Sequence, residues 1–171
     1  MHLRATLQYD ADVSSVASML ADADFVEAKL RASGALAQHA SIVGDAERGF
    51  TVTARRQMPT DAIPAQFRSL VGSTLEVRHV EAWDPASDEG ERRGTVVIEI
   101  VGAPVRLTGR LRLTPAPPDP AAGGARITLD GDLHASVPHF GSAIENAAAG
   151  AVRAALEAEE AAGRAWLAGR R

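Results

Sequence analysis

The sequence predicts an α+β fold: an antiparallel sheet of about seven strands, two short helices after the first strand, and one long helix at the C-terminus. Apolar and polar residues alternate with period two over residues 2–9 and through most of 36–135, as in half-buried strands. Apolar residues recur at helical spacing after the first strand and again from residue 142 onward. With 171 residues, of which 46% are hydrophobic, we expect a single domain spanning residues 1–171.

The N-terminal strand and the two short helices follow from local signals. Residues 2–9 alternate between an apolar and a polar face. Asp12 stands before apolar residues at helical spacing, where it is placed to cap the first helix. The tetrapeptide at residues 24–27 has the shape of a capping box for the second helix, and we expect Gly34 to end that helix in a left-handed conformation.

The middle of the chain predicts six further antiparallel strands, because apolar and polar residues alternate there and mostly Gly and Pro separate the alternating segments. We expect them near residues 36–45, 48–58, 73–84, 93–101, 104–114 and 125–135. Pro59 and Pro64 interrupt this series, and the residues that follow fit a short helix over 65–71. The charged segment 84–93 and the proline-rich segment 115–124 are expected to be exposed loops.

The last two strands divide most clearly into two faces. Leu107 and Leu111 alternate with arginines, and the following strand shows the same alternation with Asp and His, so one side of this hairpin faces the core and the other water. A capping box at residues 142–145 then predicts the start of the long helix, which runs toward Leu167.

Composition excludes several classes of function. The chain has no cysteine, which rules out disulfides, thiolate metal sites and cysteine nucleophiles. A net charge of −4 and only 4% aromatic residues disfavour nucleic acid as a partner. The N-terminus shows no signal-peptide pattern, and charged residues interrupt the most apolar stretch, residues 143–162. We therefore expect a cytoplasmic protein without stable membrane insertion.

The sequence assigns no catalytic residue, metal ligand or cofactor. Nucleophile elbows, phosphate loops and dinucleotide fingerprints are missing. The best metal-like group is Asp130, Asp132 and His134, with His139 nearby. Alternation places these strand residues on the outward face, so solvated polar side chains explain them better than a metal site does.

The order of elements is supported by a set of specific residues: Arg56-Gln57-Met58-Pro59-Thr60-Asp61, Ile63-Pro64, Val71-Gly72, Leu75, Val77, Glu81, Trp83, Gly102, Pro104, Gly109, Val137-Pro138, Gly141 and Ile144-Glu145. Together they resemble an actinobacterial START-like family of unknown function, within the SRPBCC (birch-pollen-allergen-like, helix-grip) superfamily. The resemblance implies a curved sheet that grips the long helix, with an apolar cavity between them. It brings no assigned catalytic residues.

The residues themselves also favour a cavity, although an ordinary core explains them nearly as well. The long helix is rich in alanine, and Gly109 and Gly131 omit side chains on the inward face of neighbouring strands. In the alternative interpretation these glycines mark bends in the sheet. We expect the ligand to contact Val77, Trp83, Leu107, Leu111, Ile127, Leu129, Leu133, Phe140, Ala148, Ala151, Val152 and Ala155, with Arg56 at its head group.

These observations lead to three functional hypotheses. The first is a non-enzymatic intracellular binding protein for a hydrophobic small molecule, such as a lipid, an isoprenoid or a polyketide-like compound, with the short helix over 64–71 gating entry. The second is a cyclase-like or aromatase-like enzyme in the same cavity, for which His79, Glu81 and Arg56 are the candidate proton-transfer groups. The third is a protein-interaction module with an unknown partner.

Overall fold

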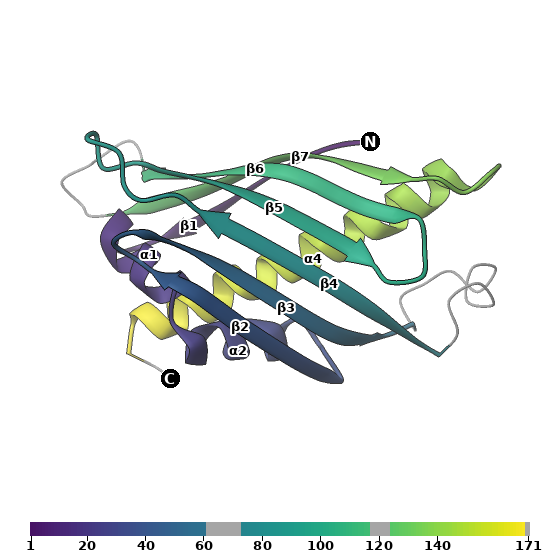
Figure 1. Ribbon diagram of the computed structural model, residues 1–171, viewed down its shortest axis with the longest axis horizontal. Coiled ribbons are helices and arrows are strands. Elements are labelled where there is room, and N and C mark those ends of the chain that lie inside the picture. The colour runs from purple at the N-terminus through teal and green to yellow at the C-terminus, as the bar shows by residue number, and fades with distance from the viewer. Residues whose placement is uncertain (61–72, 117–123, 170–171) are drawn as a thin grey trace.

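One seven-stranded antiparallel sheet, in the order β1-β7-β6-β5-β4-β3-β2, forms the body of the molecule in the computed structural model (Figure 1). The structure describes residues 1–60, 73–116 and 124–169. The strands are β1 (His2–Tyr9), β2 (Ala37–Asp45), β3 (Gly49–Pro59), β4 (Thr74–Trp83), β5 (Arg92–Ile100), β6 (Val105–Pro115) and β7 (Ala125–Ala135). The helices are α1 (Val13–Leu20), α2 (Ala23–Ala32) and α4 (Gly141–Leu167).

The sheet and α4 form two layers. Helix α4 runs across one face of the sheet, which lies in front of it in Figure 1. Helices α1 and α2 lie on the same side as α4 and contact it. This arrangement confirms the α+β helix-grip fold expected from the sequence. Among the described residues, no helix combines the length and the apolar character needed to cross a membrane.

The core lies between these two layers, because alternate residues of each strand face the helices. On β6, for example, Leu107 and Leu113 are fully buried, while Arg110 and Arg112 between them are exposed. The predicted division of the last two strands into two faces is therefore confirmed. Trp166 of α4 packs edge-on against Phe25 of α2, with ring centroids 5.6 Å apart, which anchors the C-terminal end of α4.

The helix starts were only partly predicted. Asp12 caps α1 as expected, accepting a hydrogen bond from the Ser15 N–H. The expected box at residues 24–27 is wrong, because Asp22 caps α2 and accepts from the Asp24 N–H instead. Gly34, with φ +81°, has the left-handed conformation that was predicted at the end of this helix.

The capping box expected at the start of α4 is also wrong. Phe140 occupies the N-cap position without a side-chain hydrogen bond, and Ser142 lies inside the helix. Glu145 turns instead toward β7, where its Oε1 accepts a hydrogen bond from the Ala135 N–H at 3.1 Å. The short helix expected over 65–71 and most of the loop expected over 115–124 lie outside the described residues.

Gly109 and Gly131 serve close packing, not open space. They are paired directly across β6 and β7. A Cβ added to Gly131 lies 2.6 Å from the Thr108 carbonyl oxygen, and one added to Gly109 lies 3.0 Å from a Leu129 methyl carbon. The missing side chains therefore allow the backbones to approach in a bent sheet and leave no cavity at this point.

Candidate functional site

A group of buried charges lies between the sheet and the helices. Lys29 of α2 is 5% exposed and Glu81 of β4 is 7% exposed. The Lys29 Nζ lies 3.3 Å from Glu81 Oε1 and 3.1 Å from Oε1 of Glu159, which belongs to α4. One ammonium group thus links α2, β4 and α4, which are separated by up to 130 residues in the chain.

The two carboxylates keep the buried lysine charged. Burial by itself lowers the pKa of Lys29, but the charges of Glu159 and Glu81 outweigh it, and the pKa lies above its usual value. Burial likewise raises the pKa of Glu81, while Lys29 and His79 lower it more strongly, so this pKa lies well below its usual range. At neutral pH the lysine is therefore an ammonium ion and Glu81 is a carboxylate.

Arg56 and His79 extend this polar group along the inward face of β3 and β4. Arg56 Nη1 donates a hydrogen bond to Ser33 Oγ at 3.1 Å. His79 Nε2 lies 2.9 Å from Glu81 Oε1 and so contacts this buried carboxylate. Within the described residues, Arg56 Nε is a buried nitrogen without a hydrogen-bond partner. One buried donor therefore remains available to a further group.

Burial has the largest effect on the pKa of the Arg56 guanidinium. It lowers the Arg56 pKa, and the negative charges of Glu159 and Glu81 only partly oppose this effect. Lys29 and Arg56 carry two positive charges, and Glu81 and Glu159 carry two negative charges. The charges of these four side chains therefore cancel.

A small internal cavity adjoins these polar groups. Its volume is about 40 Å³. Helix α2 and the residue after it contribute one side, three strands of the sheet another, and α4 the third; the lining residues are Lys29, Leu30, Ser33, Arg56, His79, Ile98, Val152, Ala155, Leu156 and Glu159. Ile98 of β5 and the α4 residues Val152, Ala155 and Leu156 make one part of the lining apolar. Arg56, His79 and the Lys29–Glu159 ion pair make the rest polar.

The residues predicted to contact a ligand divide into three groups. Arg56, Val152 and Ala155 line the internal cavity. Most of the others are packed into the hydrophobic core beside it: Val77, Trp83, Leu107, Leu111, Ile127, Leu129 and Leu133 are all buried, and Ala148 is half-buried. Two lie outside the cavity, since Phe140 is 49% exposed at the start of α4 and Ala151 is exposed on the outer side of that helix.

Lys29 and Glu159 were missed by the sequence reasoning, although a signal for Lys29 was present. It is the single lysine of the chain, and it shares the buried stripe of α2 with Phe25, Val26 and Leu30. A charged residue on an apolar helix face is expected to have a buried partner. Glu159 gave no such signal, because acidic residues are frequent in that part of α4.

The candidate metal residues lie on the other side of the sheet. Asp132 and His134 are exposed on the outer face of β7, as their alternation predicted. His2 of β1 lies 3.3 Å from Asp132 and 3.5 Å from Asp130, which makes a surface contact of the kind found between neighbouring strands. Among the described residues, no group of three or more His, Asp or Glu side chains is arranged to hold a metal ion.

An antiparallel sheet that grips a long C-terminal helix is the START-like helix-grip fold, and several solved structures share it with this chain. The crystal structure of TTHA0849 from Thermus thermophilus is similar, with a TM-score of 0.60, 15% sequence identity, and coverage of 97% of this chain and 99% of that one. Ara h 8.0201 gives a TM-score of 0.56 and 12% identity, covering 99% and 98%. A START superfamily protein from Mycobacterium smegmatis gives 0.52 and 13%, covering 94% of each chain.

The chain belongs to the family described as "Protein of unknown function (DUF2505)", whose model matches residues 4–167. The uncharacterised protein Rv0481c of Mycobacterium tuberculosis strain H37Rv is 28% identical over 142 residues, which cover 80% of this chain and 79% of the relative. The uncharacterised protein Mb0491c of Mycobacterium bovis matches equally well. The resemblance to an actinobacterial START-like family of unknown function is thereby confirmed.

Proposed function

We propose that this protein is a cytoplasmic, non-enzymatic binding protein that holds a hydrophobic small molecule between the sheet and α4. The main support for the proposal is apolar surface that stays partly exposed both on the inward face of the sheet and on the side of α4 that faces it. Ile98 and Ile100 of β5 belong to the inward face of the sheet, and Val152 and Leu156 belong to α4, yet all four remain partly exposed while packing against the core. Their incomplete burial supports a place for an apolar ligand.

Uptake of a ligand requires the space under α4 to enlarge. A volume of about 40 Å³ holds little more than one water molecule, whereas ligand pockets in proteins measure about 300–1,000 Å³. Within α4, which spans 27 residues, only Ala149 and Gly163 are fully buried among those described. Its middle turns therefore have little packing to lose when the helix moves outward.

The ends of α4 are more firmly attached than its middle. Glu145 bonds to β7 at one end and Trp166 packs on α2 at the other. A Cβ added to Gly163 lies 2.5 Å from the Tyr9 ring, so the helix backbone rests closely on β1 there. We infer that the ligand enters beside Val152 and Leu156, between these attachments.

The site supports a ligand that is mostly apolar and carries an oxygen acceptor. Apolar surface removed from water contributes about 25 cal/mol per Å². Arg56 Nε is the buried donor that such an oxygen would contact. Because the surrounding charges already balance, a neutral group such as a carbonyl or hydroxyl fits better than a charged one, as in a lipid, an isoprenoid or a polyketide-like compound.

The experiment is a fluorescence titration of the full chain with N-phenyl-1-naphthylamine, a neutral apolar probe. Ala155→Trp places an indole in the cavity, and Ala151→Trp places the same group one turn away on the exposed side of α4. We expect the wild type and Ala151→Trp to bind the probe and Ala155→Trp to lose most of its binding. Failure of the wild type to bind, or equal binding by both variants, would overturn the proposal.

A cyclase-like or aromatase-like enzyme is the second candidate, favoured by the inward placement of His79, Glu81 and Arg56. Buried ionisable groups with shifted pKa values are common in active sites. However, the pKa of Glu81 is lowered by its neighbours, which makes this carboxylate a weak base at neutral pH. Conversion of a bound compound to a product of different structure, lost in His79→Gln, would support the enzyme; an unchanged compound would support the binding protein.

A further inference from the structure

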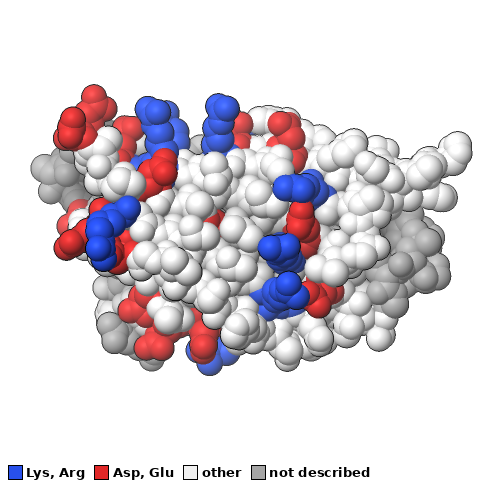
Figure 2. All heavy atoms as spheres, viewed as in Figure 1, with Lys and Arg blue, Asp and Glu red and all other residues white. Residues whose placement is uncertain are grey.

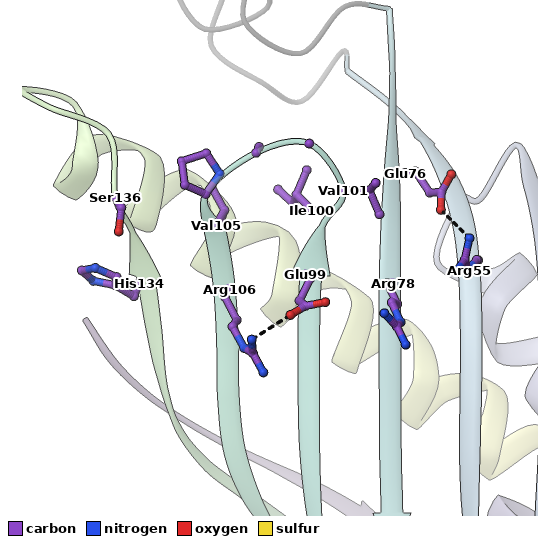
Figure 3. A pocket seen from close by; sticks show the side chains of 13 residues that line it. Arg55, Glu76, Arg78, Glu99, Ile100, Val101, Val105, Arg106, His134 and Ser136 are labelled. Atoms are coloured by element: carbon purple, nitrogen blue, oxygen red, sulfur yellow. Dashed lines mark hydrogen bonds and ion pairs between the residues drawn. The ribbon is translucent and has the colours of Figure 1, made fainter.

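A second hollow lies on the outer face of the sheet, beside the turn between β5 and β6 (Figure 3). Its volume is about 550 Å³. Because successive residues of a strand point to opposite faces, Arg55 and Arg78 line this outer groove while Arg56 and His79 line the internal cavity. The two sites are therefore separated by the sheet.

The floor of the outer groove is a row of charged side chains that the strand register aligns. From β3 to β7 the row consists of Arg55, Arg78, Glu99, Arg106 and His134. Neighbouring strands lie about 4.8 Å apart, so a small molecule in the groove reaches several of them. Figure 2 shows a column of basic and acidic side chains to the right of centre on this face, with further charged side chains toward its left, upper and lower edges.

Among the described residues, Arg78 is the member of this row without a side-chain partner. Arg55 Nη1 lies 3.4 Å from Glu76 Oε1, and Arg106 Nη1 lies 2.9 Å from Glu99 Oε1. In the part of the chain that the structure describes, no ion pair or hydrogen bond reaches the Arg78 side chain, which lies between these two pairs (Figure 3). Three guanidinium groups thus face two carboxylates, which leaves one positive charge in the groove.

The register makes this charge costly without a counterion. Arg78 is directly opposite Arg55 in the pairing of β3 with β4, and like charges in that position repel each other. On its other side it is directly opposite Glu99 of β5, but that carboxylate lies 2.9 Å from Arg106 Nη1 and is shared with it. An anion bound at Arg78 would remove that repulsion. The guanidinium presents paired N–H donors in a plane, which matches the oxygens of a carboxylate or a phosphate.

The rim of the groove is apolar and completes the site. Val101, Ala103 and Pro104 form one edge, and Val101 is 53% exposed. We propose that the outer groove binds a carboxylate or phosphate group at Arg78 and the adjoining hydrocarbon at this apolar rim. The site is independent of the cavity under α4, and its ligand is a free amphipathic anion or the headgroup of an anionic lipid.

Two arms of one experiment separate these sources. Hexanoate and butyl phosphate are titrated into the full chain and followed by NMR chemical shifts, and binding to phosphatidylcholine vesicles is measured with and without phosphatidylglycerol. We expect saturable binding that is weakened about tenfold or more in Arg78→Gln, because charge-assisted hydrogen bonds are lost. Arg110→Gln is the control, since Arg110 is exposed on the same face of β6 but outside the groove.

Each outcome decides the proposal. Binding of the free anions that depends on Arg78 supports a small-molecule site, and Arg78-dependent binding only to anionic vesicles supports a headgroup site. The absence of saturable binding in both arms would overturn it, as would equal weakening by Arg78→Gln and Arg110→Gln, which would indicate nonspecific charge attraction. Ala155→Trp should leave this binding unchanged, which separates it from the cavity under α4.

Discussion

Replacing Lys29 with methionine keeps the length and apolar stem of the side chain but removes its charge. In the folded protein this leaves Glu81 and Glu159 without the ammonium group that lies 3.3 and 3.1 Å from them. Glu81 is 7% exposed, so water does not readily replace the lost partner. We therefore expect Lys29→Met to destabilise the fold strongly.

The loss in the free energy of unfolding follows from the distances of these two ion pairs. At an effective dielectric constant of about 20, each ion pair contributes about 5 kcal/mol of attraction. The cost of removing the charges from water offsets part of this, and loss of one partner of a buried pair typically costs about 3–5 kcal/mol. For a domain of this size, that loss lowers the Tm by roughly 6–20 °C.

Urea denaturation followed by circular dichroism measures the change in the free energy of unfolding. Arg31→Met is the matched control, because Arg31 lies on the exposed side of the same helix, and its cost should stay within about 0.5 kcal/mol. Adding Glu81→Gln to Lys29→Met should recover part of the lost stability by removing one unpaired charge. A loss no greater than that of Arg31→Met, or no recovery in the double variant, would refute the role assigned to Lys29.

Two further predictions concern pH and helix packing. The folded state holds the Glu81 pKa below its ordinary value of 4.5, so the Glu81 carboxylate stabilises the fold above this pH. This contribution to the free energy of unfolding should be lost as the pH falls below 4.5, by up to ~1.4 kcal/mol per pH unit. Acid melts of Glu81→Gln should show a shallower decline than the wild type, and equal slopes would contradict this. Gly163→Ala should cost about 1–3 kcal/mol because its methyl group meets the Tyr9 ring. Gly150→Ala, exposed in the same helix with open space around it, should instead stabilise by about 0.5–1 kcal/mol, and a loss of stability equal to that of Gly163→Ala would contradict the packing.

The strands were predictable because each has one buried face and one exposed face. The alternation around Leu107 is a direct consequence, and it also located Asp132 and His134 on the outer face. The cap of α2 was less predictable, since two acidic residues stand near the start of this helix. Asp22 and Asp24 are two residues apart, and which of them caps α2 depends on the direction from which the chain enters.

Three of the residues predicted to contact a ligand line the cavity, but the buried ion pairs beside it were not predicted. Arg56, Val152 and Ala155 were named from the sequence, whereas the contact of Lys29 with Glu159 spans 130 residues and has no local pattern. Ala151 was placed inward although it is exposed. Alanines occur on all sides of this helix and therefore do not mark its buried face clearly. Successive residues are rotated by about 100° around the helix axis, so a small error in the assumed orientation of the helix changes which alanine is expected to face the sheet.

Native mass spectrometry of the freshly purified protein, compared with its denatured mass, tests most directly whether the space under α4 is a binding site. We expect a retained apolar compound at one per chain, which an organic extract releases for identification. Ala155→Trp should lose this compound while Ala151→Trp keeps it. A wild-type chain that carries no compound and also takes up neither lipids nor N-phenyl-1-naphthylamine would contradict the binding function and leave a protein-interaction role in its place.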